Sequence, residues 1–239
     1  MKLYDNMIDV TMETLAGQQG KRADYSPDGA WKCLDNTEFI MQRDAGAELG
    51  SAPNPSVNYT CVSTSGKVTR DEILVYGRDI GEITSGCGFA RIVILETNDL
   101  GEDTDTEKAF QAIRNLEFVR YHVFPEGYMV RVSSQSNQEQ VRISRDALRK
   151  RIDFAAVGSS YIKKYKEVTV VKNVRIIFIT DAELVEKLVP NADKVDAITR
   201  TLTHILDGMP TDCGHCSMKP VCDEVDGLKE LHLGKKAAK

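Results

Sequence analysis

Three cysteines near the carboxyl end carry the clearest chemical signal in this sequence. Cys213, Cys216 and Cys222 follow one another with the spacing C-x2-C-x5-C. Two cysteines separated by two residues can turn both sulfurs toward one centre, and the next five residues let the chain return with a third. Thiolates are soft ligands that suit zinc and iron–sulfur clusters. We therefore predict a metal centre in this segment.

An iron–sulfur cluster, [4Fe–4S] in type, fits this spacing better than zinc. A structural zinc site usually takes four protein ligands, often as two C-x2-C pairs, and the segment holds one such pair. Three close cysteines with a distant fourth ligand suit a [4Fe–4S] cluster. Zinc stays an alternative because His215 and His232 could complete its site. A third interpretation is three ordinary reduced thiols.

The fourth ligand must come from elsewhere in the chain, and Cys87 is the residue we favour. It stands in the loop sequence Ser-Gly-Cys-Gly at residues 85–88, where glycines let a backbone approach a cluster closely. Cys33 and Cys61 are the other candidates, and for each of the three taken alone a plain core or loop residue is the simpler interpretation. No apolar leader is visible, so we predict a cytoplasmic protein with reduced thiols and no disulfide.

A basic cluster is the second candidate site. It comprises Arg142, Arg145, Arg149, Lys150 and Arg151, opposed by Asp146 and Asp153. Arg145 and Arg149 are four residues apart and would share one face of a helix. Because arginine forks recognise phosphate groups, the cluster is a candidate site for an anionic ligand. A solvated helix face with local ion pairs is the simpler alternative.

Composition argues against several other classes of protein. The chain has 239 residues, of which 41% are hydrophobic, as in globular proteins. Its 31 Lys plus Arg and 36 Asp plus Glu give a net charge of −5, so we expect no nucleic-acid partner. No apolar run approaches the roughly 20 residues of a membrane span. P-loop, dinucleotide-binding and G-x-S-x-G patterns are missing from the sequence.

The elements that must position these residues indicate an α+β fold. Helical patterns cover residues 1–16, 105–115, a short stretch after 144, 154–166, 182–188 and 191–207. Extended patterns cover 36–41, 57–63, 73–76, 90–96, 118–124, 128–133 and 168–180, and 17–30 is predicted as loop. Thr104, Ser144 and Asp181 are predicted N-caps, and Pro190 should separate the last two helices.

These patterns predict a mixed, largely antiparallel sheet with packed helices, followed by a C-terminal cysteine-rich metal-binding segment. We divide the chain into three parts. Residues 1–67 form an N-terminal helix with an irregular or strand segment, and residues 68–190 form an α+β domain. Residues 191–239 form a helix followed by the iron–sulfur segment.

Residues 68–222 resemble a known family. The segments 75–80, 118–124, 128–132, 141–147 and 174–181 follow the order of the middle domain of the acetyl-CoA synthase β subunit of the carbon monoxide dehydrogenase complex. In that family a C-x2-C-x8-C segment follows this domain and begins a nickel–iron–sulfur site. The resemblance implies that Cys213, Cys216 and Cys222 bind an iron–sulfur cluster, and that the arginines attract CoA.

The sequence also departs from that family. No cysteine follows Cys222, the third cysteine is spaced differently, and the Cys-Gly-Cys motif that holds a distal nickel is missing. The resemblance therefore implies an accessory or redox iron–sulfur protein of anaerobic one-carbon metabolism, with a corrinoid protein or redox protein as partner. The alternatives are an active acetyl-CoA synthase-type enzyme completed by other ligands, and a zinc-stabilised module that binds CoA or a protein.

Overall fold

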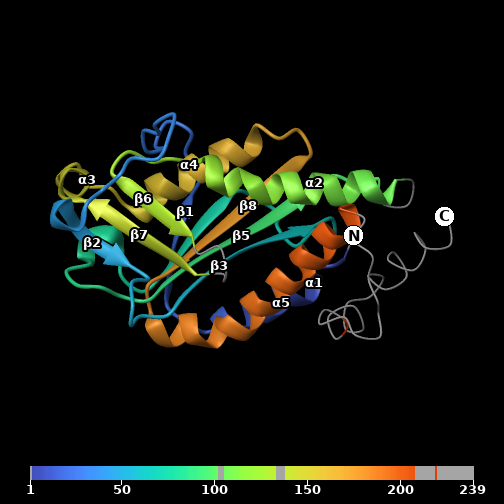
Figure 1. The fold of residues 1–239 in the computed structure, drawn as a ribbon, viewed down its shortest axis with the longest axis horizontal. Coiled ribbons are helices and arrows are strands. Elements are labelled where there is room, and N and C mark those ends of the chain that lie inside the picture. Colours follow the sequence, from blue (N-terminus) through green and yellow to red (C-terminus); the bar gives the residue numbers. More distant parts are fainter. Residues whose placement is uncertain (1, 102–104, 133–137, 208–218, 220–239) are drawn as a thin grey trace.

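Two β-sheets and the helices packed on them make up the computed structural model, which describes residues 2–101, 105–132, 138–207 and 219 (Figure 1). The larger sheet has the strand order β1 (Gly20–Asp24), β4 (Glu72–Tyr76), β8 (Val171–Ile179), β5 (Phe89–Thr97) and β3 (Ser56–Ser63). The smaller sheet has the order β2 (Ala45–Leu49), β7 (Glu139–Ser144) and β6 (Tyr128–Val132). The predicted cysteine-rich segment lies outside the described residues, Lys219 excepted.

The helices are α1 (Asp5–Leu15), α2 (Thr106–Val119), α3 (Arg145–Arg149), α4 (Phe154–Lys166) and α5 (Ala182–Leu206). Three short 3-10 turns, η1 (Gln42–Asp44), η2 (Ile80–Glu82) and η3 (Arg120–His122), lie between them and the strands. In the larger sheet β4 pairs with β8 and β3 with β5 in parallel, while β1–β4 and β5–β8 are antiparallel. Both pairings of the smaller sheet are antiparallel. The predicted α+β class with a mixed, mostly antiparallel sheet is confirmed.

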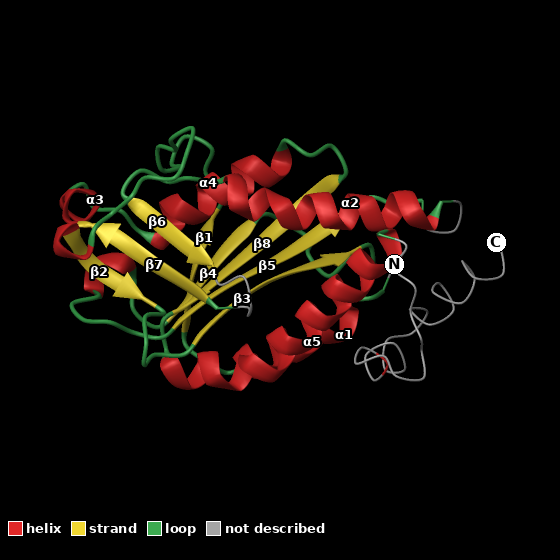
Figure 2. Ribbon diagram, in the orientation of Figure 1, coloured by secondary structure: helices red, strands yellow, loops and turns green. Residues whose placement is uncertain are grey.

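Helices cover both faces of the larger sheet (Figure 2). Successive residues of a strand point to opposite faces. On β3, Tyr59 meets α1 and α5 through Thr11 and Asn191, whereas Asn58 meets Arg120 on the other face, where α2 and α4 lie. Because both faces are covered, β5 is buried along its whole length. This explains the unbroken apolar run at 92–95.

Side-chain caps begin four of the described helices, including α4, where Asp153 Oδ1 accepts a hydrogen bond from the Ala156 amide at 2.7 Å. Ser144 Oγ accepts a hydrogen bond from the Ala147 amide at 3.1 Å, and Asp181 Oδ1 accepts one from Leu184 at 3.1 Å, as predicted. Helix α2 is capped by Asp105, whose Oδ1 accepts from the Lys108 amide at 3.0 Å. The predicted cap at Thr104 lies outside the described residues.

The segment predicted as a strand at 118–124 is helical instead. Helix α2 runs to Val119 and η3 follows it. Its Val, Tyr and Phe residues favour strands, but Arg120 is drawn into the interior by Asn58 and by Glu117, one helical turn earlier. The helical spacing buries Leu116 and leaves Phe118 55% exposed.

Three further predictions of secondary structure were wrong. Pro190 lies inside α5, which continues to Leu206, because Leu188, Ala192 and Val195 bury a continuous apolar face that outweighs one missing amide hydrogen bond. The predicted loop at 17–30 contains β1, an edge strand that pairs with β4 and places Arg22 beside Glu72. The segment 36–41 contains no strand.

Strands from both sides of residue 67 share the larger sheet, since β1 and β3 pair with β4 and β5. Helix α5 likewise extends across residue 190. One hydrophobic core runs from Leu3 to Ile205. None of the helices among the described residues is long and apolar enough to cross a membrane.

Candidate functional site

Strand β2 lies between two of the sequence-predicted sites. On one side it pairs with β7, where Glu48 is opposite Arg142. At its end Leu49 forms a bridge to Cys87, and the Gly50 amide donates to the Cys87 carbonyl at 2.9 Å. A hollow of about 210 Å³ lies beside β2, lined by residues 42, 45–48, 85 and 86. The structure therefore brings the arginine cluster and the cysteine loop to one region.

Arg142 is already neutralised by a carboxylate. Its Nε donates to Glu48 Oε1 at 2.7 Å, and its Nη1 donates to the Ile40 carbonyl at 3.4 Å. Both side chains of the ion pair are only about a quarter exposed, because β2 and β7 hold them side by side. An arginine held in this way contributes less to attracting an anion than its charge suggests.

The other basic residues lie on helix α3 and directly after it, and they differ in whether a carboxylate engages them. Arg149 and Lys150 share Asp146, at 3.1 and 2.8 Å, and Lys150 also reaches Glu126 at 3.0 Å. These hydrogen bonds lower the pKa of Asp146, Lys150 being the larger cause. Arg145 and Arg151 are exposed and have no ion pair within the described parts of the chain. The arginines available to a ligand are therefore these two.

Arg145 packs against Gly46, one of the residues that line the hollow beside β2. A Cβ built on Gly46 would lie 3.2 Å from Arg145 Cγ and 2.5 Å from Leu148 Cδ1. Gly46 itself lines the hollow, so its missing side chain lets α3 approach β2 closely. Arg145 itself is exposed, so its guanidinium is open to an anionic group in solvent.

Cys87 is buried, with 5% of its surface exposed. Burial raises the pKa of its thiol, and the charge of Arg78 opposes this shift. The glycine after it has a packing role, because a Cβ on Gly88 would lie 2.8 Å from Ala182 Cα at the start of α5. Metal ligation requires the thiolate, whereas burial favours the neutral thiol. A cluster at Cys87 would therefore have to displace the apolar groups that surround it.

Helix α5 lies between Cys87 and Asp207, the last described residue before the C-terminal cysteines. Cys87 lies near the first residue of α5, and the 25 residues of that helix span roughly 37 Å. The six residues from Asp207 to Cys213 can span at most about 22 Å. A fully extended linker therefore covers little more than half the length of the helix.

The other cysteines lie apart from Cys87. Cys61 is completely buried on β3 and Cys33 is exposed beside Pro125. Cys213, Cys216 and Cys222 lie outside the described residues. Within 2–101, 105–132, 138–207 and 219, His, Cys, Asp and Glu side chains do not gather in threes as a metal site. A centre built on Cys87 would take its other ligands from the C-terminal segment.

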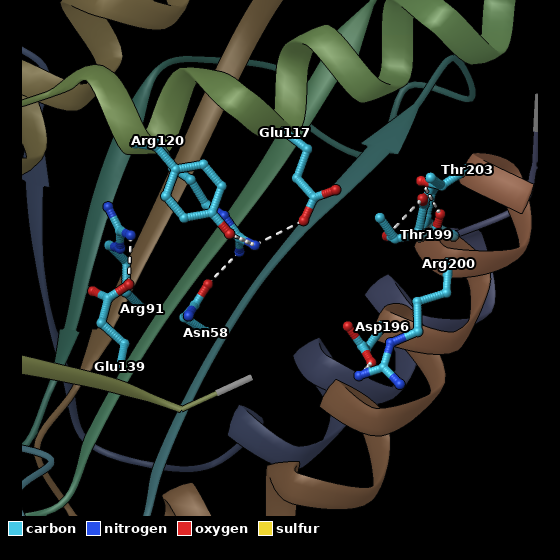
Figure 3. A network of polar contacts seen from close by, with 11 residues as sticks. Asn58, Arg91, Glu117, Arg120, Glu139, Asp196, Thr199, Arg200 and Thr203 are labelled. Carbon is cyan, nitrogen blue, oxygen red and sulfur yellow. Dashed lines mark hydrogen bonds and ion pairs between the residues drawn. The ribbon is translucent and has the colours of Figure 1, made fainter. Parts of the chain in front are cut away.

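A buried polar network was missed by the sequence analysis (Figure 3). Arg91 donates to Glu139 at 2.5 Å, and Arg120 donates to Asn58 and, at 2.7 Å, to Glu117. The visible signal was an arginine inside the apolar segment 90–96. The partner of this arginine could not be predicted from the sequence, because Glu139 lies on a strand of the other sheet.

The sequence has relatives among known proteins. Residues 34–185 match the family described as the CO dehydrogenase/acetyl-CoA synthase complex beta subunit. Acetyl-CoA decarbonylase/synthase complex subunit beta from Archaeoglobus fulgidus is 26% identical over 153 residues, 63% of this chain and 28% of the relative. Carbon monoxide dehydrogenase/acetyl-CoA synthase subunit alpha from Moorella thermoacetica is 24% identical over 186 residues, which cover 77% of this chain and 25% of the relative. The chain spans about a quarter of the length of these relatives.

Proposed function

Because the chain belongs to the family of the CO dehydrogenase/acetyl-CoA synthase complex beta subunit, we propose that it is an accessory iron–sulfur protein in anaerobic one-carbon metabolism. The observation that carries this proposal is the family match over 34–185, which includes both sheets apart from β1. The C-x2-C-x5-C segment after α5 supports the iron–sulfur part.

Cys213, Cys216 and Cys222 hold the cluster in this proposal. A [4Fe–4S] cluster would give the protein a one-electron carrier or an organised docking surface. The fourth ligand predicted from the sequence is Cys87. Its buried thiol and the length of α5 both argue against that assignment, so the prediction needs a direct test. Zinc, completed by His215 or His232, is the alternative metal.

Analysis of iron, sulfide, zinc and nickel after strictly anaerobic purification tests the proposal. About four irons and four sulfides per chain without nickel are expected. Cys213→Ala and Cys216→Ala should each lower the iron content sharply, whereas Cys61→Ala, a matched change at a buried thiol on β3, should not. Stoichiometric zinc without sulfide would favour the zinc-stabilised module, and stoichiometric nickel would favour an acetyl-CoA synthase-type enzyme. A folded, metal-free protein would refute the proposal.

Cys87→Ala decides the fourth ligand. Unchanged iron content would remove Cys87 from the ligand set and leave that position to another residue of the chain, a partner or a small molecule. Loss of iron in this variant alone, with normal folding, would establish the ligand predicted from the sequence.

The free arginines support CoA as a candidate ligand. Arg145 and Arg151 are unpaired within the described residues and offer forked donors to phosphate groups. Arg145→Ala with Arg151→Ala should weaken CoA binding in calorimetry, and Arg149→Ala should do so less because Asp146 already engages that residue. Equal affinity in all variants would exclude a CoA site on α3.

A corrinoid protein or redox protein is the partner that this role requires. The relatives carry the names of complex subunits, which supports a protein partner of some kind. Mixing the anaerobically purified protein with candidate corrinoid proteins should give a complex in analytical ultracentrifugation. If only redox proteins bind, the electron-transfer role is favoured.

A further inference from the structure

A second pocket lies away from the arginines and the cysteine segment. It has a volume of about 380 Å³, within the range of small-molecule sites, and opens between the loop at 27–34, the residues that follow α2, and α4. The side chains that matter chemically are Trp31, Lys32, Cys33, His122, Lys163 and Lys164. None of them belongs to the proposed cluster or CoA sites.

The walls of this pocket are fixed by hydrogen bonds. The Trp31 amide donates to the Ala156 carbonyl at 3.0 Å, and Ser160 Oγ donates to the Trp31 carbonyl at 2.8 Å, which ties the loop to α4. The Trp31 indole donates to the Glu126 carbonyl at 2.8 Å, and the Leu34 amide donates to the Phe124 carbonyl at 2.8 Å. The pocket is therefore preformed, as most small-molecule sites are.

The pocket carries an excess of positive charge. Three lysines line it, against one carboxylate, Glu167. Glu167 is engaged by Lys164 at 2.6 Å. Lys32 shares the Glu126 carboxylate with Lys150, at 2.9 and 3.0 Å, so one anion serves two cations. Lys163 has no ion pair within the described residues. In a chain of net charge −5 this concentration of lysines attracts an anion locally.

Two further groups face the same space. His122 uses Nδ1 in a 2.9 Å hydrogen bond with the Phe118 carbonyl, which leaves Nε2 available. Cys33 is the exposed one of the three cysteines that the structure describes. Ammonium groups bind phosphate as point charges. Because Nδ1 of His122 donates to a carbonyl, Nε2 of a neutral imidazole can only accept a hydrogen bond, as from a hydroxyl group of a ligand.

We propose that this pocket binds a small phosphorylated metabolite, with Lys163 and Lys164 contacting the phosphate and Cys33 beside the ligand. The proposal is independent of the predicted cluster, because the pocket uses none of Cys87, Cys213, Cys216 and Cys222. The chain contains a single tryptophan, Trp31, so ligand binding has a built-in fluorescent reporter in the pocket wall.

Titration of the anaerobically purified full-length protein with inorganic pyrophosphate tests this site. A saturable change in Trp31 emission, matched by calorimetry, is expected. Lys163→Met should weaken binding roughly tenfold, the usual loss for one charge-assisted hydrogen bond. Lys187→Met is the matched control, because it removes the same charge from an exposed position on α5 and should leave the affinity unchanged. Thermal unfolding of both variants confirms that they are folded.

Alkylation of Cys33 gives a second readout. Pyrophosphate should slow the reaction of Cys33 with iodoacetamide several-fold in the wild type and have little effect in Lys163→Met. The proposal is overturned if pyrophosphate gives neither heat nor a change in emission at millimolar concentration. Equal weakening by Lys163→Met and Lys187→Met, or equally tight binding of citrate, would also overturn it, since each would show non-specific anion attraction.

Discussion

Arg91 and Glu139 form an ion pair that joins the two sheets and from which water is excluded. Arg91 Nη2 lies 2.5 Å from Glu139 Oε2, and the side chains are 1% and 0% exposed. Arg91 belongs to β5 and Glu139 to β7, so the pair fixes the smaller sheet against the larger one. The Tyr161 ring of α4 covers the guanidinium, with its centroid 4.4 Å from Arg91 Cζ.

Removing one partner of this pair should destabilise the protein strongly. Arg91→Met leaves the Glu139 carboxylate buried without its cation, and we expect a loss of about 3–5 kcal/mol in the free energy of unfolding. The double variant Arg91→Met with Glu139→Met should recover much of that loss, because no buried charge remains. Urea denaturation measures both values. A double variant no more stable than Arg91→Met would contradict this, because it would show that the unpaired buried charge is not the source of the loss.

Asn191 should contribute a smaller but measurable amount. Its Nδ2 donates to the Met7 carbonyl at 3.0 Å and to Thr11 Oγ1 at 2.9 Å, which links α5 to α1 in the core. Asn191→Leu should reduce the free energy of unfolding by about 1–3 kcal/mol, because buried hydrogen-bonding groups lose their partner. Asp193→Ala, at an exposed position two residues on, should change stability by less than about 0.5 kcal/mol.

Glu117 should make stability depend on pH. Burial raises its pKa above the ordinary 4.5, Arg120 opposes the shift, and Asp196 adds to it. A raised pKa in the folded state means that the contribution is present below the unfolded pKa and is lost as pH rises through the folded pKa. The wild type should therefore lose stability relative to Glu117→Gln as the pH increases from 4.5 toward neutrality. Urea denaturation at several pH values checks this, and parallel profiles would contradict it.

Pro190→Ala should stabilise the protein. Pro190 lies within α5 and is exposed, so its ring contributes little packing. Alanine restores an amide donor to the Glu186 carbonyl and has a higher helix propensity, which predicts a gain of about 1–3 kcal/mol. Thermal and urea denaturation measure the change. A loss of stability would show that the helix depends on the bend or packing that proline imposes.

The sequence pattern predicted most clearly the elements that are buried on both sides. Strands β3 and β5 and helix α4 appear close to their expected ranges, because their apolar residues follow one period without interruption. The position of β8 between β4 and β5 could not be predicted in this way, since strand order depends on contacts distant in sequence. The continuity of α5 could not be predicted either. Proline is a local signal for a helix end, and here the burial of the apolar helix face outweighs it.

The sequence indicated which residues form the candidate site, but it could not indicate which of them are already engaged in ion pairs. The arginines of 142–151 are evident from the sequence, but Arg142 is neutralised by Glu48, which lies 94 positions earlier. The pocket beside Trp31 is assembled from three separated segments and has no signature in any of them. The glycines around Cys87 suggested a close approach, and at Gly88 the approaching group is Ala182 of α5.

The place of β8 at the middle of the larger sheet has a consequence for synthesis. Strands β4 and β5 both need β8 as neighbour, and it is encoded about a hundred residues after the first of them. A nascent chain that has emerged only to residue 170 holds β4 and β5 without the strand that joins them. The ribosome must release most of the polypeptide before its central layer can close, so the growing chain exposes two apolar strands to chaperones in the meantime.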